Sequence, residues 1–118
     1  MEKLSKSEIE KKLVVIESPF AGDVEMNKCY ARAAMSDCLD RKEQPYASHL
    51  LFTQPGILDD NDPKERRLGI QAGFLWGQNA EVTVVYTDLG ITKGMKQGIE
   101  AAKERGAEVE YRTLEAWQ

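Results

Sequence analysis

The strongest constraint on the fold is a regular alternation of short apolar runs with longer segments of helical periodicity. Four segments are predicted strands: residues 13–17, which are apolar and rich in β-branched residues, 44–52, with Pro45 at the entry, 81–86, and 109–114, which alternate like a half-exposed edge strand. Three segments between them have the period of an amphipathic helix: residues 24–41, 62–79 and 92–106. Strands that alternate with helices in this way predict an α/β fold with a parallel sheet.

The predicted architecture is a three-layer sandwich, in which helices cover both faces of a four-stranded parallel sheet. Crossovers between parallel strands are right-handed, which leaves few strand orders. We predict the order 2-1-3-4 of a short flavodoxin-like or Rossmann-like sheet. A chain of 118 residues is long enough for one domain with one core. We place this domain at residues 13–118 and expect a tail or a short helix at residues 1–12.

Capping residues mark the ends of two predicted helices. Asp62 can accept a hydrogen bond at the start of the second helix, where Pro63 suits the first position. Thr92 can cap the third helix, and Gly106 ends it. Apolar residues at helical spacing are expected to face inward: Leu68, Ala72, Leu75 and Trp76 on the second helix, and Met95, Ile99 and Ala102 on the third.

Composition excludes several classes of partner. The formal net charge of −4 provides no basic surface for duplex nucleic acid. No apolar run approaches the ~20 residues of a membrane helix. The charged N-terminus does not resemble a signal peptide, so we expect a cytoplasmic protein.

Cys29 and Cys38 fall on opposite faces of the first helix at about 100° per residue, and we expect both to be buried, reduced thiols. Since no Cys or His cluster has metal-ligand spacing, we expect neither a metal nor a cofactor.

Two loops are expected to meet at the carboxyl ends of the central strands. In the order 2-1-3-4 the direction of winding reverses between the first and third strands, and ligands bind at such a switch point. The loop at residues 17–23 reads ESPFAGD, in which the stiff Pro19 and the aromatic Phe20 suit a small-molecule pocket. The loop at residues 87–98 reads TDLGITKGMKQG and should lie beside it.

The second loop has residues that suit an anion. Thr92 lies at a predicted helix N-terminus, where free amide groups and the helix dipole favour negative charge. Gly94 lets the backbone approach a ligand closely, and Lys93 adds positive charge. Plain helix capping is the equal alternative. Since the chain has neither a Walker A motif nor a GxGxxG motif, ATP hydrolysis and NAD binding are not predicted.

Several other polar and small residues have two possible roles each, one in ligand binding and one in the structure. His49 follows the second predicted strand and either contacts a ligand or makes a structural hydrogen bond. Asp59 and Asp60 lie in an acidic loop, which is either a solvated turn or a contact for Mg²⁺ or a sugar hydroxyl. A stripe of small residues on the third helix either packs on the sheet or admits a ligand: Gly94, Gly98 and Ala102.

Four stretches, in this order along the chain, resemble the nucleoside 2-deoxyribosyltransferase family: SPFAGD, SHLLFTQ, DDNDPKERRLG and GMKQGIEAAKERGAEV. The resemblance spans about residues 13–111. Within the family, the chain most resembles a compact branch that bacteriophages and prophages often carry. It implies a pocket for a nucleoside or a nucleotide as the small-molecule partner. It also implies a homo-oligomer, located in the cytoplasm of a bacterium or of an infected host cell.

The resemblance implies roles for several residues. Enzymes of the family exchange or hydrolyse the bond between base and deoxyribose, using one carboxylate as nucleophile and a second acid to protonate the leaving base. By position, Thr92 and Gly94 would hold a 5′-phosphate, and Phe20 would lie beside the base or sugar. The predicted ligand-binding residues are Ser18, Pro19, Phe20, Gly22, His49, Asp59, Asp60, Thr92, Gly94 and Gly98.

One position departs from the family pattern. The family's nucleophilic glutamate lies in a segment like G-M-x-x-E-I, whereas this chain reads GMKQGI and has Gly98 there. Glu100 is about 200° further around the helix and faces away. Glu17 and Asp88, which lie at the ends of the two central strands near the switch point, are therefore the candidate catalytic carboxylates. Two functions stay open at nearly equal rank: an enzyme of deoxyribosyl transfer or nucleotide N-hydrolysis, and a phage-type protein without catalysis that sequesters a nucleotide-derived signal. An interaction protein whose cleft is vestigial ranks below them.

Overall fold

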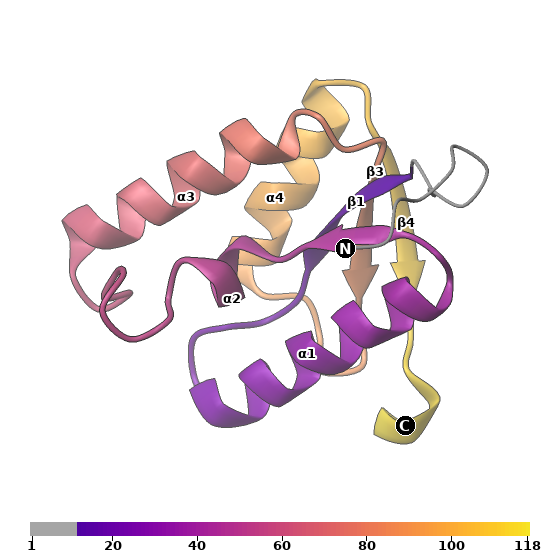
Figure 1. Cartoon of the computed structure of the whole chain (residues 1–118), viewed down its shortest axis with the longest axis horizontal. Helices are drawn as coiled ribbons and strands as arrows, with labels where there is room; N and C mark the ends of the chain where they lie inside the picture. Colours follow the sequence, from indigo (N-terminus) through magenta and orange to yellow (C-terminus); the bar gives the residue numbers. More distant parts are fainter. Residues whose placement is uncertain (1–11) are drawn as a thin grey trace, which may run out of the picture.

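The computed structural model describes residues 12–118, so the tail or helix expected at the N-terminus lies outside the described residues, apart from Lys12. Strands and helices alternate along the chain (Figure 1): β1 (Leu13–Glu17), α1 (Val24–Asp40), β2 (Gln44–Tyr46), α2 (Ser48–Leu51), α3 (Pro63–Gly77), β3 (Val82–Tyr86), α4 (Lys93–Glu104) and β4 (Glu108–Arg112). A short 3₁₀ turn, η1 (Glu115–Trp117), follows β4.

The strands form one parallel sheet in the order β2-β1-β3-β4, which confirms the predicted topology. β1 and β3 are neighbours at its centre, with Val14 opposite Val82 and Glu17 opposite Val85. Because the winding reverses between these two strands, the loops that follow them leave the same edge of the sheet side by side.

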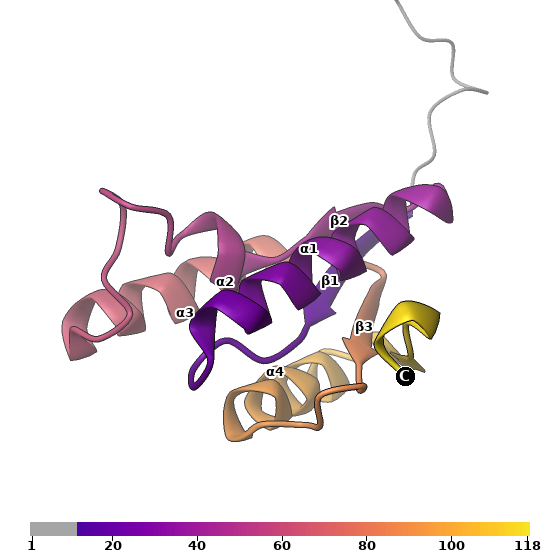
Figure 2. The same ribbon diagram turned by 90° about the horizontal axis from the view of Figure 1, so that it is seen from below.

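The two faces of the sheet are covered by different helices. On one side, the main core joins residues of β1 and β3 to residues of α1: Val14, Ile16, Val82, Val84, Tyr30, Ala34 and Cys38. On the other side, Val85 packs against Met95 and Ile99 of α4. Figure 2 shows α1 and α4 on opposite sides of the sheet, which confirms the three-layer arrangement. Within the described range, no helix is long and apolar enough to span a membrane.

The predicted helix caps are present. The Asp62 side chain accepts a hydrogen bond from the Lys64 N–H at 2.9 Å, and Thr92 Oγ1 accepts one from the Met95 N–H at 3.3 Å. Gly106 follows α4 with a φ of 77°, a left-handed conformation that glycine adopts without strain.

The second predicted strand is too long. Only Gln44–Tyr46 pairs with β1, and Ser48–Leu51 form α2. The N–H groups of Leu51 and Phe52 donate to the carbonyl oxygens of Ala47 and Ser48, at 3.0 Å in each case, so this segment bonds to itself rather than to the sheet. A short segment of mixed apolar and polar residues without a clear period suits a strand and a helical turn equally well, which is why the prediction was wrong. His49 therefore lies on a helix.

The inner face of α3 also differs from the prediction. Leu68, Leu75 and Trp76 point outward, and the Trp76 side chain is 67% exposed. The inward face carries glycines instead. A Cβ on Gly73 would come within 2.9 Å of the Ser48 Cβ, and one on Gly77 within 3.1 Å of Val15 Cγ2. α3 therefore packs against α2 and β1 through a stripe of small residues.

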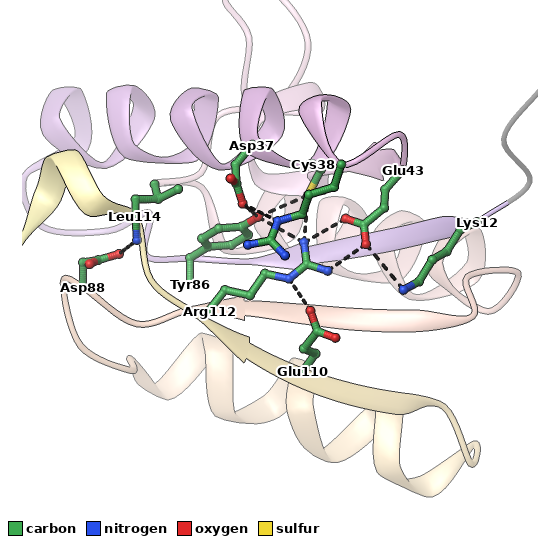
Figure 3. Close-up of polar contacts among 10 residues, drawn as sticks. Lys12, Asp37, Cys38, Glu43, Tyr86, Asp88, Glu110, Arg112 and Leu114 are labelled. Atoms are coloured by element: carbon green, nitrogen blue, oxygen red, sulfur yellow. Dashed lines mark hydrogen bonds and ion pairs between the residues drawn. The ribbon is translucent and has the colours of Figure 1, made fainter.

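A buried ion pair ties β4 to the chain after α1 (Figure 3). The Nη1 and Nη2 atoms of Arg112 donate to the two Glu43 oxygens at 2.8 Å and 2.7 Å, and both side chains are buried. These hydrogen bonds lower the pKa of Glu43, although burial acts in the opposite direction. Cys38 is buried beside this pair, whereas Cys29 is exposed, so the expectation of buried thiols is confirmed for Cys38 and wrong for Cys29.

Candidate functional site

A cavity of about 310 Å³ lies where the loops after β1 and β3 meet, on the side of the sheet that α3 and α4 cover. This volume is at the lower end of the range for small-molecule sites, about 300–1,000 Å³. Many of the predicted site residues line it: Glu17, Ser18, Phe20, His49, Asp60, Thr92, Gly94 and Gly98. The two loops thus enclose one shared hollow, as the strand order predicts.

The loop after β1 is held in place by α1. The buried Asn27 donates from Nδ2 to the carbonyl oxygens of Phe20 at 2.9 Å and of Ala21 at 3.1 Å. Asp23 caps α1 by accepting a hydrogen bond from the Met26 N–H at 3.2 Å. These contacts fix the backbone that presents Phe20 to the cavity.

Ser18 and His49 form a polar pair in the cavity wall. Ser18 Oγ and His49 Nε2 share a hydrogen bond of 2.7 Å, and the Phe20 ring meets the His49 ring edge-on at a centroid distance of 6.3 Å. Burial lowers the pKa of His49 from 6.5 to about 4, so the imidazole is neutral at neutral pH. A neutral imidazole can orient a ligand hydroxyl or amide group without adding positive charge.

Glu17, the last residue of β1, brings a carboxyl group into the cavity beside Gly98 of α4. Burial raises the pKa of Glu17 from 4.5 to about 8, although the positive charge of Arg105 acts in the opposite direction. The group is therefore mostly protonated at neutral pH and can donate a hydrogen bond or a proton. A carboxyl group with a raised pKa in a cleft is a candidate for proton transfer.

Positive charge dominates the rest of the lining. Arg66 comes from α3, Lys93 from the start of α4, and Arg105 follows the end of α4. Asp60 pairs with Arg66, with 3.8 Å between Oδ1 and Nε. With Glu17 protonated, the cavity carries excess positive charge, which favours an anionic ligand. In the part of the chain that the structure describes, no group of three or more His, Cys, Asp and Glu side chains could hold a metal ion.

The N-terminus of α4 lies at the cavity, but the Thr92 hydroxyl is already engaged. Thr92 Oγ1 caps the helix, and the Thr92 N–H donates to Met95 Sδ at 3.4 Å. What this helix end offers to a ligand is therefore the exposed backbone of Lys93 and Gly94.

Four predicted site residues do not line the cavity: Pro19, Gly22, Asp59 and Asp88. Gly22 makes the turn before α1 with a φ of 101°. Pro19 is buried within the loop after β1. Asp59 is exposed, and its side chain accepts a hydrogen bond from the Asn61 N–H at 2.9 Å in its own loop.

Asp88 lies on the side of the sheet that α1 covers (Figure 3). Its Oδ2 accepts a hydrogen bond from the Tyr30 hydroxyl at 2.6 Å. The same atom accepts one from the Leu114 N–H at 2.9 Å, which Figure 3 shows. Burial disfavours the charged form, but these hydrogen bonds prevail and lower the pKa of Asp88. An ionised carboxylate held by α1 and the C-terminal segment contributes to the fold, so we do not carry Asp88 into the catalytic proposal.

Sequence reasoning missed the parts of the lining that come from α3 and from beyond α4. Gly69, Gly73 and Gly77 recur every four residues, and this spacing was the available signal for the inward face of α3. Arg66 lies seven residues before Gly73, on the same face. Arg105 had no comparable signal, because it lies past the end of the helix.

Comparisons with known proteins agree with this fold. The model of the family described as domain of unknown function (DUF7768) matches residues 12–112. The chain belongs to that family. Among solved structures, the DUF7768 chain is similar to a 2-deoxyribosyltransferase from the psychrotolerant bacterium Bacillus psychrosaccharolyticus, described as a biocatalyst for nucleoside synthesis. The TM-score is 0.65 over 86% of this chain and 72% of that one, and the sequence identity of 13% means that the likeness shows the fold. No curated protein sequence matches the chain.

Proposed function

We propose that this DUF7768 protein binds a nucleoside or nucleotide in the cavity and acts on the bond between the base and the deoxyribose. The observation that carries the proposal is the Glu17 carboxyl group, which stands, mostly protonated, in a cavity at the switch point of the sheet. The fold shared with a protein described as a 2-deoxyribosyltransferase for nucleoside synthesis adds support.

The lining has a group for each part of such a ligand. We assign the base to the apolar wall that includes Phe20 and Phe74. The Ser18–His49 pair is the assigned partner for a sugar hydroxyl. A 5′-phosphate would lie near Lys93 and the exposed start of α4, where positive charge and free amide groups favour an anion.

The test is to incubate the protein with each 2′-deoxynucleoside and each 5′-monophosphate, with and without a second free base. Chromatography would measure released base and any new nucleoside, and calorimetry would measure binding. We expect binding of at least one ligand and release of its base, with the monophosphates preferred. A protein that binds none of these ligands and releases no base would overturn the proposal.

The absence of a carboxylate at position 98 favours a second candidate, a protein that binds a nucleotide-derived signal without breaking it. A protonated Glu17 is a weak nucleophile, which agrees with this alternative. In the same experiment the alternative expects binding without base release. Denatured protein from cells should then release an intact ultraviolet-absorbing ligand, which mass spectrometry would identify.

A further inference from the structure

The Glu17 carboxyl group occupies the space that a side chain at position 98 would fill. Gly98 is buried in α4 and faces β1, and a Cβ built on it would lie within 2.8 Å of all three atoms of the Glu17 carboxyl group. Real Cβ atoms do not come so close to their neighbours, so this position of Glu17 and any side chain at position 98 exclude each other. Glycine in a helix interior is less favourable than alanine, so a glycine here calls for a packing reason.

We infer that Gly98 is a positioning residue whose missing side chain admits the Glu17 carboxyl group, and that Glu17 is the proton donor to the leaving base. The chemical part of this inference rests on the proposed function, whereas the spatial part does not. The carboxyl group reaches the cavity from a strand of the sheet, and α4 contributes only the room for it.

The surroundings of Glu17 suit a donor. Desolvation raises the pKa of Glu17 and the positive charge of Arg105 lowers it, whereas no hydrogen bond from residues 12–118 affects this pKa. An unpaired carboxylate in such a place is costly, so the neutral acid is favoured and its proton is available to a ligand. The other carboxyl group in the lining, Asp60, is paired with Arg66.

In the proposed step, water is the co-reactant and the bond between base and sugar is hydrolysed. The proton passes from Glu17 to a ring nitrogen of the base as the bond between that base and the sugar carbon breaks, and the bonding electron pair leaves with the base. Water then adds to the sugar carbon and returns a proton to the Glu17 carboxylate. This route needs no covalent bond between protein and sugar.

The spatial part is tested by thermal unfolding of Gly98→Ala in two backgrounds. In the wild type, the new methyl group must displace the Glu17 carboxyl group, and this displacement offsets the gain in helix propensity, so the melting temperature should rise less than that gain predicts, or fall. In a Glu17→Ala background, the same change meets no carboxyl group and should raise the melting temperature, because alanine favours the helix. An equal effect in both backgrounds would overturn the inference.

The chemical part is tested by base release from the deoxynucleotide that the wild type turns over best. Glu17→Gln should lower kcat about 10²–10⁴-fold with little change in KM. The wild-type rate should fall above about pH 8, as Glu17 loses its proton. The charged groups in the same lining are Arg105, Lys93, Arg66 and Asp60, and the titratable His49 is neutral at this pH. Glu100→Gln, which changes an exposed carboxyl group on α4, is the matched control and should leave the rate unchanged.

The two proposals fail in different ways. Wild-type protein that releases no base would end the proposed function and the donor role together, while the Gly98→Ala comparison would still decide the spatial part. An active wild type whose Glu17→Gln variant keeps its kcat would overturn the donor role alone.

Discussion

Replacement of Glu17 by glutamine should stabilise the protein at alkaline pH and change its stability little at acidic pH. A glutamate in the unfolded chain ionises near pH 4.5, whereas burial in the fold raises the pKa of Glu17 to about 8. Between these two values the folded protein holds a proton that the unfolded chain has lost, so the free energy of unfolding falls as the pH rises. Below this window both states are protonated, and above it the full cost of the buried charge remains. Glutamine does not titrate and removes the effect.

The size of the effect follows from the interval between the two pKa values. Each pKa unit corresponds to about 1.4 kcal/mol, so the interval from 4.5 to about 8 sets an upper limit of about 5 kcal/mol. The cavity admits water, which hydrates the ionised carboxylate in part. We therefore expect a gain of about 1–3 kcal/mol for Glu17→Gln above the window.

Urea unfolding from about pH 4 to about pH 9 would measure this difference. Tryptophan fluorescence can report the transition, because Trp117 packs against Tyr30 with ring centroids 5.0 Å apart. The difference between variant and wild type should open between about pH 5 and pH 8 and then stay constant. Glu100→Gln, whose side chain is exposed, should show no such curve. A difference that does not change with pH, or a wild type that is more stable than the variant at high pH, would refute the reasoning.

Three further outcomes are expected elsewhere in the molecule. His49 should stabilise the fold above pH 6.5 and lose that contribution as the pH falls toward about 4, because the unfolded chain binds a proton that the buried ring does not. His49→Asn should reduce this loss of stability in urea unfolding at acidic pH, and an unchanged loss would contradict the prediction. Glu43→Leu removes two hydrogen bonds from the buried Arg112, which keeps Glu110 as its remaining carboxylate partner, and should cost about 2–3 kcal/mol in urea unfolding, whereas the double change with Arg112→Met should cost much less. Additive costs would show that the pair is not coupled. We propose that a second copy of this chain binds the exposed apolar side of α3. Leu75→Glu with Trp76→Glu should then convert an oligomer into a monomer, as measured by light scattering. A wild type that is already monomeric would exclude this partner.

Most of the fold could be predicted because local signals and global topology agree. The alternation of apolar runs with capped helices defines a parallel sheet, and the handedness of the crossovers leaves few strand orders. Prediction was wrong where one pattern suits two structures. Residues 44–52 mix apolar and polar side chains without a clear period of two or of 3.6, and only contacts distant in sequence decide that β2 ends at Tyr46 and α2 begins at Ser48.

The inward face of α3 shows why apolar periodicity alone is not sufficient. Leu68, Leu75 and Trp76 form an apolar stripe, whereas Gly69, Gly73 and Gly77 form a stripe of small residues on another side. Which stripe packs inward depends on how closely the helix approaches its neighbours. Here Ser48 and Val15 lie so near that only glycine fits, and the larger side chains remain outside.

The two candidate carboxylates could have been separated by the parity of their strands. Side chains alternate between the faces of a strand, so Glu17 shares the face of Val15, which lines the cavity. Asp88 lies two residues beyond Tyr86, which packs with α1, and it keeps that direction. Glu17 ends β1 and Asp88 follows β3 at the same edge of the sheet, yet alternation sends their side chains to opposite faces. Of the two, only Glu17 can act on a ligand that lies between β1 and α4, and this is why the proposed chemistry depends on a single carboxyl group and on the glycine that makes room for it.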